Sequence, residues 1–300
     1  MTCKCCGKSD KWNADNIGDQ SGKHAIVTGA NSGVGYYTAL ELGRAGANVI
    51  IASRDKVRGN TALKQLRQEA PAASFRLELL DLSDQMSVRL FADRYLATNE
   101  PLDILVNNAG IMALPERELT VDGFEKQFGT NHLGHFSLTG LLLPALKQSK
   151  APRVVSVSSK AADFGKIEID NLQSERLYKP MRTYGQSKLA NLAFMLELGR
   201  RVPWLTSVAS HPGITASNLQ KHTFARFAKI TGQPISDAAL PSLRAAVDET
   251  QSGKFYGPKS WFQMRGTPVE VKLPNSTRNN ELNNALWEES ERLTGVCFQC

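Results

Sequence analysis

Apolar and polar positions alternate between two patterns along residues 24–210. Short apolar runs, typical of buried strands, occupy residues 24–28, 48–52, 75–80, 104–106, 153–158 and 206–210. Between them, apolar residues recur at helical spacing over residues 36–45, 57–69, 121–147 and 184–201. Strands that alternate with helices in this way predict βαβ units and a parallel sheet. A last strand at residues 254–256 and a last helix at residues 281–293 bring the expected number of strands to about seven.

One α/β domain, a doubly wound parallel sheet with helices on both faces, accounts for nearly the whole chain. We place it at residues 21–296, after a polar tail at residues 1–20 and before a short tail at residues 297–300. Residues 214–250 are expected to be loop and helix. With 300 residues, 41% of them hydrophobic and 22% charged, the chain has ample material for one core.

The net charge of +7 could attract nucleic acid, an acidic membrane or a phosphorylated cofactor. The sequence contains no block of five or six adjacent basic residues and no nucleic-acid motif, so we expect no nucleic-acid partner. No run approaches 18 consecutive apolar residues, and the first 11 residues form no apolar signal segment. We therefore expect a cytoplasmic protein without a stable membrane anchor.

All five cysteines lie near the ends of the chain, at Cys3, Cys5, Cys6, Cys297 and Cys300. This distribution excludes a core built on disulfides and fits a reducing compartment. Three explanations of the clusters stay open: functionally silent tails, a zinc or similar metal clip if the termini meet, and redox-labile thiols. Catalysis should depend on none of them, and we assign no residue to a metal site.

The sequence Tyr184-Gly185-Gln186-Ser187-Lys188 opens an amphipathic helical run. Residues four apart share a helix face, so the Tyr184 hydroxyl and the Lys188 ammonium can point into one site. A nearby ammonium stabilises a phenolate and moves the tyrosine pKa down toward the working range. The pair predicts acid/base chemistry on a carbonyl or an alcohol, although the same spacing also occurs on solvated helix faces.

A glycine-rich turn, Thr-Gly-Ala-Asn-Ser-Gly-Val-Gly at residues 28–35, joins the first expected strand to the first expected helix. Glycines let the backbone approach a pyrophosphate, and the helix N-terminus offers unpaired N–H groups and the positive end of its dipole. In this context the turn predicts a dinucleotide site. The residues that we assign to it are Gly29, Asn31, Ser32, Gly33, Val34 and Gly35.

The end of the second expected strand distinguishes the two nicotinamide dinucleotides. An acidic residue about 20 positions beyond the glycines would bind the ribose 2′-hydroxyl of NAD. Here Ser53 is followed by Arg54, a cation that suits a 2′-phosphate. We predict NADP(H) as the cofactor; Asp55 follows directly, so NAD(H) stays open.

With these pieces assembled, the chain resembles the short-chain dehydrogenase/reductase family over about residues 20–296. The motifs that carry the resemblance occur in the family's order: the turn at 28–35, Asp81-Leu82, Asn107-Asn108-Ala109-Gly110, Asn131, Ser158-Ser159, Tyr184-x-x-x-Lys188 and Pro212-Gly213. Residues 127–136 and 184–191, and the long spacing from Ser159 to Tyr184, are similar to the branch of retinol dehydrogenases and protochlorophyllide reductases. The resemblance implies a Rossmann-type fold and an oxidoreductase.

The resemblance also implies a role for each matching residue. Tyr184 would exchange a proton with the substrate oxygen, and Lys188 would lower the pKa of Tyr184 and hold the nicotinamide ribose. Ser159, the second serine of its pair, would hydrogen-bond the substrate carbonyl, and Asn131 would hold a water that connects Lys188 to solvent. The remaining cofactor contacts would come from Ser53, Arg54, Asp81, Leu82, Asn108, Ala109, Gly110, Pro212, Gly213 and Thr215.

The implied reaction is a reversible hydride transfer between NADP(H) and the carbonyl or alcohol of a moderately apolar small molecule. A non-catalytic NADP(H)-binding sensor or scaffold is the alternative. An amphipathic segment at residues 219–230 would cover the substrate, with ordinary packing or membrane contact as alternatives. Because family members often assemble through the helices after Asn131 and at Tyr184, the resemblance also suggests a homodimer or homotetramer.

Overall fold

The computed structural model of the chain describes residues 12–214, 232–260 and 262–298. Its centre is an eight-stranded sheet in the order β3-β2-β1-β4-β5-β6-β7-β8. The strands are β1 (His24–Thr28), β2 (Asn48–Ser53), β3 (Ser74–Leu79), β4 (Ile104–Asn107), β5 (Arg153–Val157), β6 (Thr206–Ser210), β7 (Phe255–Pro258) and β8 (Pro268–Glu270). All pairs are parallel except the antiparallel pair of β7 and β8. The chain reverses direction across the sheet between β1 and β4, where doubly wound folds bind their ligands.

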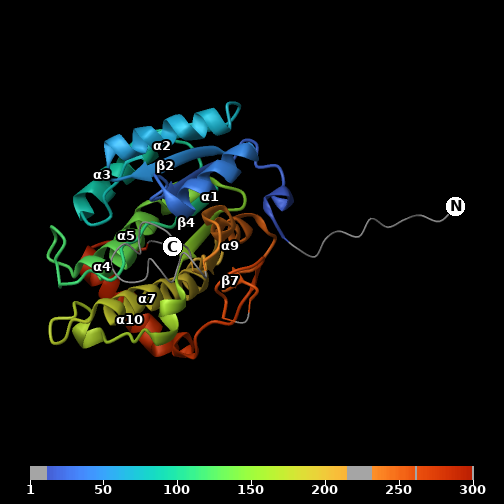
Figure 1. The fold of residues 1–300 in the computed structure, drawn as a ribbon. Helices are drawn as coiled ribbons and strands as arrows, with labels where there is room; N and C mark the ends of the chain where they lie inside the picture. The colour runs from blue at the N-terminus through green and yellow to red at the C-terminus, as the bar shows by residue number, and fades with distance from the viewer. Residues whose placement is uncertain (1–11, 215–231, 261, 299–300) are drawn as a thin grey trace.

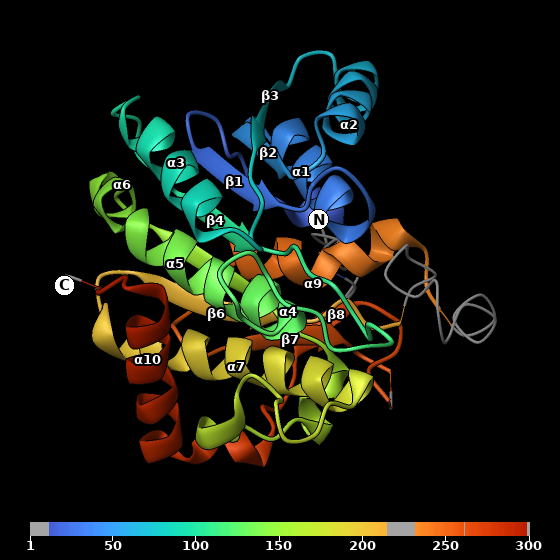
Figure 2. The same cartoon turned by 90° about the vertical axis from the view of Figure 1, so that its left-hand side faces the viewer.

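Helices cover both faces of this sheet (Figures 1 and 2). One face carries α1 (Gly33–Arg44), α2 (Lys56–Glu69) and α9 (Ile235–Val247), and the other carries α3 (Gln85–Leu96), α5 (Gly134–Leu141) and α7 (Pro180–Arg201). α10 (Asn280–Thr294) packs against α7. The shorter elements are η1 (Ala14–Asn16), α4 (Lys126–Phe128), η2 (Gly129–Leu133), α6 (Leu143–Gln148), η3 (Lys160–Phe164), η4 (Ile169–Asn171) and η6 (Asn275–Arg278).

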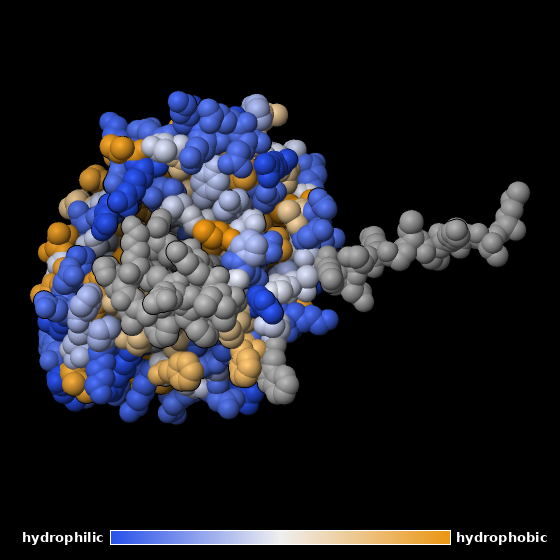
Figure 3. All heavy atoms as spheres, viewed as in Figure 1, coloured by the Kyte–Doolittle hydropathy of each residue, from blue (hydrophilic) through white to orange (hydrophobic). Residues whose placement is uncertain are grey.

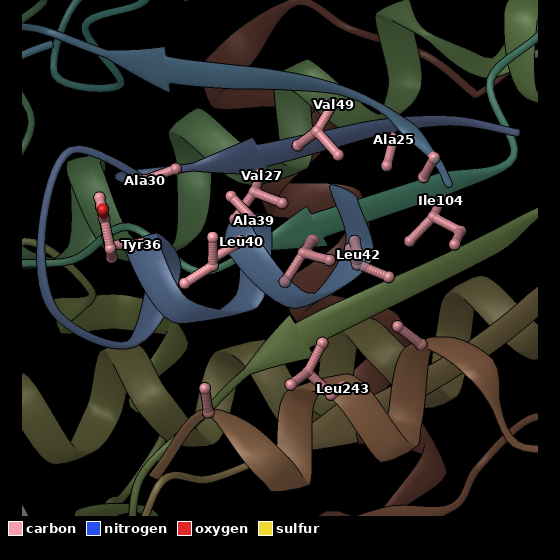
Figure 4. Packing of buried hydrophobic residues seen from close by; sticks show 14 of the residues in the cluster. Ala25, Val27, Ala30, Tyr36, Ala39, Leu40, Leu42, Val49, Ile104 and Leu243 are labelled. Carbon is pink, nitrogen blue, oxygen red and sulfur yellow. The ribbon is translucent and has the colours of Figure 1, made fainter. Parts of the chain in front are cut away.

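The core between α1, α9 and the sheet shows why the strands are continuous apolar runs (Figure 4). Leu40 of α1 and Leu243 of α9 are buried in one cluster with Val27 of β1 and Val49 of β2. A second cluster fills the opposite face, beneath α3, α5 and α7. Because both faces of the sheet are covered, residues on both faces of the inner strands β1, β2 and β4 are mostly apolar, as is usual for parallel sheets.

The predicted doubly wound fold is confirmed, and the six inner strands begin and end within one or two residues of their expected bounds. The three-residue β8 was not predicted. α3 was not predicted either: Asp84 caps it by accepting from Met86 N and Ser87 N, but the exposed side chains of Met86 and Leu90 obscure the apolar spacing.

The long helical stretch expected at residues 121–147 is observed at residues 126–148, divided into α4, η2, α5 and α6. Helical structure begins at Lys126, widens into the π-helical turn η2 and is interrupted again at Leu142, two residues before Pro144. The apolar spacing runs through these interruptions, so periodicity alone could not reveal them. α7, in contrast, begins earlier than the expected start at residue 184. Its first residue is Pro180, and proline suits the first position of a helix.

α10 covers the faces of α5 and α7 that point away from the sheet. Trp287 of α10 stacks on Phe194 of α7 and meets Phe136 of α5 edge-on, with ring centroids 5.7 and 5.1 Å apart. Aromatic pairs in these arrangements stabilise packing beyond the area that they bury. The resemblance places the expected subunit interface on α5 and α7. Because α10 of the same chain packs on part of that surface, homo-oligomerisation stays a prediction.

Within the described ranges, no helix combines the length and apolar character that crossing a membrane requires. On the face that Figure 3 shows, apolar residues are scattered among polar ones. Cys297 is an exposed free thiol, whereas Cys3, Cys5, Cys6, Cys300 and the segment 219–230 lie outside the described residues.

Candidate active site

A cavity of about 520 Å³ opens at the carboxyl ends of β1, β2 and β4. It brings together residues that lie far apart in the sequence, as expected at the switch point of a doubly wound sheet. The predicted cofactor residues that line it are Gly29, Asn31, Ser32, Gly33, Val34, Gly35, Ser53, Arg54, Asp81, Leu82, Asn108, Ala109, Gly110 and Pro212.

The turn between β1 and α1 requires glycine for two physical reasons. Gly29 has a positive φ of 66°, and an added Cβ there would lie 2.9 Å from Ala109 Cα. A Cβ on Gly35 would overlap the Asn108 side-chain nitrogen and lie 2.8 Å from Gly29 O. The turn therefore folds tightly against the end of β4.

The same turn fits a pyrophosphate. Ser32 is the N-cap of the twelve-residue helix α1, yet its side chain makes no capping hydrogen bond. An added Cβ at Gly33 would meet no protein atom within 4 Å. The Ser32 side chain thus leaves the first N–H groups of α1 uncapped. These groups and the positive end of the helix dipole lie beside open space that an anion can occupy.

Two arginines and two carboxylates lie around the end of β2. Arg54 Nε lies 3.8 Å from the Asp81 carboxylate, and its side chain is 64% exposed. Asp55 caps α2, since its carboxylate accepts hydrogen bonds from Val57 N and Arg58 N. Arg58, one helical turn beyond Arg54, also lines the cavity and was not among the predicted residues. Its position four residues after Arg54, at the start of a helix, was the signal that could have identified it.

Thr28 connects the ends of β1 and β4 beneath the cavity. Its hydroxyl oxygen accepts hydrogen bonds from the backbone N–H groups of Asn108 and Ala109, each at 2.9 Å. Asn108 returns a bond from its side-chain amide to Thr28 O at 2.7 Å. Asn108 therefore acts first as a support for the two strand ends.

β5 and α7 bring the predicted catalytic residues together beside Gly110, which lines the cavity, although none of these residues itself lines it. Tyr184 and Lys188 lie on one face of α7, with Lys188 Nζ 5.8 Å from the centre of the Tyr184 ring. Lys188 donates to Val157 O at the end of β5, at 3.1 Å. Both side chains are buried, as their places on the inner face of α7 require.

Ser159 approaches Tyr184 from the loop after β5. Ser159 donates a hydrogen bond to the Tyr184 hydroxyl. The Ser159 side chain also caps η3, because its oxygen accepts from Ala161 N. The neighbouring Ser158 instead donates to Lys188 O, 2.7 Å away inside the protein. The two serines thus have different surroundings, and Ser159 is the one that faces the tyrosine.

Burial shifts the pKa values of this pair in opposite directions. Desolvation raises the pKa of Tyr184 to about 12, and the hydrogen bond from Ser159 opposes that rise. Desolvation also lowers the pKa of Lys188 to about 8. Lys188 was expected to lower the pKa of Tyr184, but in the protein alone burial outweighs its attraction. A phenolate at Tyr184 therefore needs further positive charge in the site.

Asn131 lies in the π-helical turn η2, and its side chain supports the backbone after β4. Its Oδ1 accepts from Ile111 N at 2.8 Å, while Nδ2 donates to Ile111 O and to Ser187 Oγ at 2.9 Å. A Cβ on Gly110 would lie 3.1 Å from Asn131 Oδ1 and 3.3 Å from Lys188 Nζ, so these groups are close neighbours. The role of Asn131 in holding a water stays a prediction.

Three further cavity residues, Ile111, Met112 and Leu114, follow the Asn-Asn-Ala-Gly motif directly and were not predicted. Their position beyond a strand end was a usable signal. Among the predicted residues, Gly213 follows Pro212 with a positive φ of 72°, and Thr215 lies outside the described residues.

The histidines near the site are buried and hydrogen-bonded within the protein. His132 pairs with Ser290 and His135 with Thr28, each at 2.9 Å. His211, at the end of β6, pairs with Gln263 at 2.9 Å. These contacts give all three histidines a packing role.

The comparisons with known proteins agree with this geometry. The family model for short chain dehydrogenase matches residues 23–226. Retinol dehydrogenase 12 from Mus musculus is 40% identical over 294 residues, which cover 93% of this chain and 88% of that protein. Retinol dehydrogenase 14 from Homo sapiens is 46% identical over 306 residues, with 92% and 87% covered.

A solved structure is similar over nearly the whole chain. The crystal structure of an uncharacterized protein from Mycobacterium paratuberculosis superposes with a TM-score of 0.83 at 40% identity, covering 97% of this chain and 100% of that one. This chain therefore belongs to the short-chain dehydrogenase family, is similar to the retinol dehydrogenases within it, and is an NAD(P)-dependent oxidoreductase.

Proposed function

We propose that the protein is an NADP(H)-dependent oxidoreductase that interconverts a carbonyl and an alcohol on a moderately apolar small molecule. The observation that carries this proposal is the set of Ser159, Tyr184 and Lys188. Tyr184 and Lys188 are buried, Ser159 bonds Tyr184, and Lys188 lies close to Gly110, which lines the cavity. A binding protein needs the cavity, but it has no use for an acid, its hydrogen-bond partner and a buried cation as well.

The nicotinamide, when bound, supplies or accepts the hydride, and in its oxidised form it adds a positive charge to the site. Tyr184 then gives its hydroxyl proton to the substrate oxygen or takes one back. Ser159 donates a hydrogen bond where negative charge develops on that oxygen. Lys188 holds a positive charge near the Tyr184 ring and favours the phenolate.

The preference for NADP(H) rests on the end of β2. Arg54 and Arg58 place two cations beside the cavity, where a 2′-phosphate would gain charge-assisted hydrogen bonds. The one carboxylate that argued for NAD(H), that of Asp55, is engaged as the N-cap of α2. Its two hydrogen bonds to backbone N–H groups reduce its capacity to accept from a ribose hydroxyl.

The apolar character of the substrate is inferred from the cavity wall and from the relatives. Ile111, Met112 and Leu114 give the wall after β4 an apolar surface. Proteins named retinol dehydrogenases, which act on an apolar alcohol by their name, are 40–46% identical to this chain over most of its length. An apolar aldehyde, ketone or alcohol is therefore the class to test first.

The test is to follow NADPH oxidation by the purified protein with a panel of apolar aldehydes, ketones and quinones, and to repeat it with NADH. We expect turnover with at least one carbonyl and a higher kcat/KM for NADPH than for NADH. If the protein binds NADPH tightly but reduces nothing in the panel and oxidises no matching alcohol, the sensor alternative explains it better.

A further inference from the structure

The wall of the cavity after β4, residues 110–114, is held by three polar side chains. Asn131 bonds the backbone of Ile111 in both directions, as described above. Two residues beyond Ile111, the N–H of Ala113 donates to Gln127 Oε1 at 2.7 Å. Tyr178 Oη then donates to Leu114 O at 2.7 Å. We call residues 110–114 the β4 loop.

Gln127 also reaches α7, the helix that carries the catalytic tyrosine. Its side chain is fully buried, and Nε2 donates to Tyr178 Oη at 3.0 Å and to Pro180 O at 3.2 Å. Pro180 is the first residue of α7, and Tyr184 lies four residues further along the same helix. One amide therefore joins the cavity wall, the segment before α7 and the first turn of α7.

The bonding pattern requires this side chain. An amide offers an acceptor and two donors, and all three are used here, whereas a carboxylate has no donor and a thioether is only a weak acceptor. The partners of Gln127 Nε2 are consistent with its role as a donor. Tyr178 Oη accepts from Gln127 and donates its own proton to Leu114 O, and the Pro180 carbonyl can only accept.

The β4 loop contains a residue in an unfavourable conformation at the point where Gln127 holds it. Ala113 has a positive φ of 52°, which is uncommon for a residue other than glycine. Such conformations persist only where the surroundings impose them, and they are concentrated at functional sites. The buried bond from Ala113 N to Gln127 is the contact that fixes this residue from the side of α4.

We propose that Gln127, acting through Tyr178, is a positioning residue that sets the separation between the β4 loop and the turn of α7 that carries Tyr184. This proposal rests on the proposed oxidoreductase function. Ile111, Met112 and Leu114 line the cavity, and Tyr184 lies one helical turn beyond Pro180, whose carbonyl Gln127 bonds. A displacement of about 1 Å between such groups can slow a reaction about 100-fold, although no contact with the substrate itself is lost.

The test uses Gln127→Met, which keeps length and volume but removes the bridge, and Tyr178→Phe, which removes one hydroxyl and keeps the ring. The matched control is Gln85→Met, because Gln85 is a buried glutamine that bonds Ser137 away from the cavity. Each protein is measured for amide hydrogen exchange over residues 108–116 without cofactor, for NADPH affinity and for kcat.

For Gln127→Met we expect exchange over residues 108–116 to accelerate by about tenfold or more. We expect kcat to fall about 10- to 100-fold, while the Kd for NADPH stays within about threefold. Tyr178→Phe should show the same pattern with a smaller loss of about 3- to 10-fold in kcat, and it tests the bridge even if Gln127→Met fails to fold.

Unchanged exchange in the β4 loop of folded Gln127→Met and Tyr178→Phe would overturn the proposal, and so would losses of kcat no greater than that of Gln85→Met. The hydrogen-exchange measurement needs no turnover. If the wild-type protein reduces no carbonyl, the proposed function fails, while the exchange data still decide whether Gln127 and Tyr178 fix the loop.

Discussion

The dinucleotide end of the site is built mostly from backbone, whereas the candidate catalytic end is built from side chains, of which Asn131, Tyr184 and Lys188 are buried. At the first end, one continuous turn supplies uncapped N–H groups, and the close approach of Gly35 to Asn108 leaves no room for a Cβ. At the second end, Ser159, Tyr184 and Lys188 come from the loop after β5 and from α7, and Asn131 comes from η2. The first end should therefore be sensitive to added volume and the second to lost hydrogen bonds.

The difference also explains which end supports binding and which supports chemistry. A phosphate can be held by N–H groups and a helix dipole, which any sequence with the right glycines provides. Proton transfer needs particular functional groups. Burial alone raises the pKa of Tyr184 and lowers that of Lys188, so their protonation depends on the charges around them. Most predictions below change one end and ask whether the other is affected.

Among the variants that have a matched control, Ser159→Ala at the catalytic end should have the largest effect. Removing one donor to a developing negative charge costs about 100- to 1000-fold in kcat. The Kd for NADPH should change little, because Ser159 does not line the dinucleotide cavity. The control is Ser156→Ala on β5, whose buried hydroxyl makes no hydrogen bond among the described residues. Equal losses in the two variants would show that the serine hydroxyl has no catalytic role.

Gly35→Ala changes the dinucleotide end. The added Cβ must displace the Asn108 side chain or the backbone of Gly29, so we expect the Kd for NADPH to rise about 50-fold. Gly18→Ala is the control, since a Cβ there meets no atom within 4 Å. Titration of NADPH by its fluorescence measures both. An unchanged Kd in Gly35→Ala would mean that the turn does not contact the cofactor.

Acid should weaken the whole fold rather than one end, because the buried histidines bond different parts of it. His135 bonds Thr28, His132 bonds Ser290 and His211 bonds Gln263. Burial lowers the pKa of His132 to about 3 and those of His135 and His211 to about 4. Below the ordinary histidine pKa of about 6.5 the unfolded chain binds protons that the folded chain does not, so stability present at neutral pH is lost as pH falls. Three such groups lower the free energy of unfolding by about 2 kcal/mol between pH 7 and pH 6.

Urea denaturation at pH 7, 6 and 5 measures this loss, and His132→Leu should reduce its pH dependence by about a third. A free energy of unfolding that does not change over this range would show that the histidines become protonated in the folded protein.

The smallest effect concerns the choice of cofactor. Arg54→Ala should lower kcat/KM for NADPH about tenfold and leave that for NADH nearly unchanged, because only NADPH carries the 2′-phosphate. Lys64→Ala removes the same charge from an exposed position of α2 that does not line the cavity and serves as the control. If Arg54→Ala lowers both values equally, Arg54 acts through the stability of the loop and NADP(H) preference has another origin.

How much the sequence predicts differs between the two ends. The glycine turn and the β2 end are contiguous motifs between a strand and a helix, and nearly all the residues assigned to them line one cavity. Arg58 was missed because it lies beyond the β2 end, in the first turn of α2, and only the fold brings it to the cavity that Arg54 and Asp55 also line.

At the catalytic end, spacing placed Tyr184 and Lys188 on one face, but it could not give the environment. That burial raises rather than lowers the pKa of Tyr184 follows from tertiary packing. The π-helical turn at Asn131 and the bridge through Gln127 depend on contacts between segments about 14 to 56 residues apart, which no local pattern contains. Sequence therefore predicted the candidate reacting groups and missed the polar side chains that hold the β4 loop beside them.

The most direct test of this account is to measure turnover and NADPH affinity together in Tyr184→Phe. The account predicts that turnover falls about 1000-fold or more, while the Kd for NADPH stays within about threefold of the wild-type value, because the proton donor is lost and the dinucleotide end is untouched. Turnover within about tenfold of wild type would contradict the assignment of Tyr184 as the acid and base of the reaction.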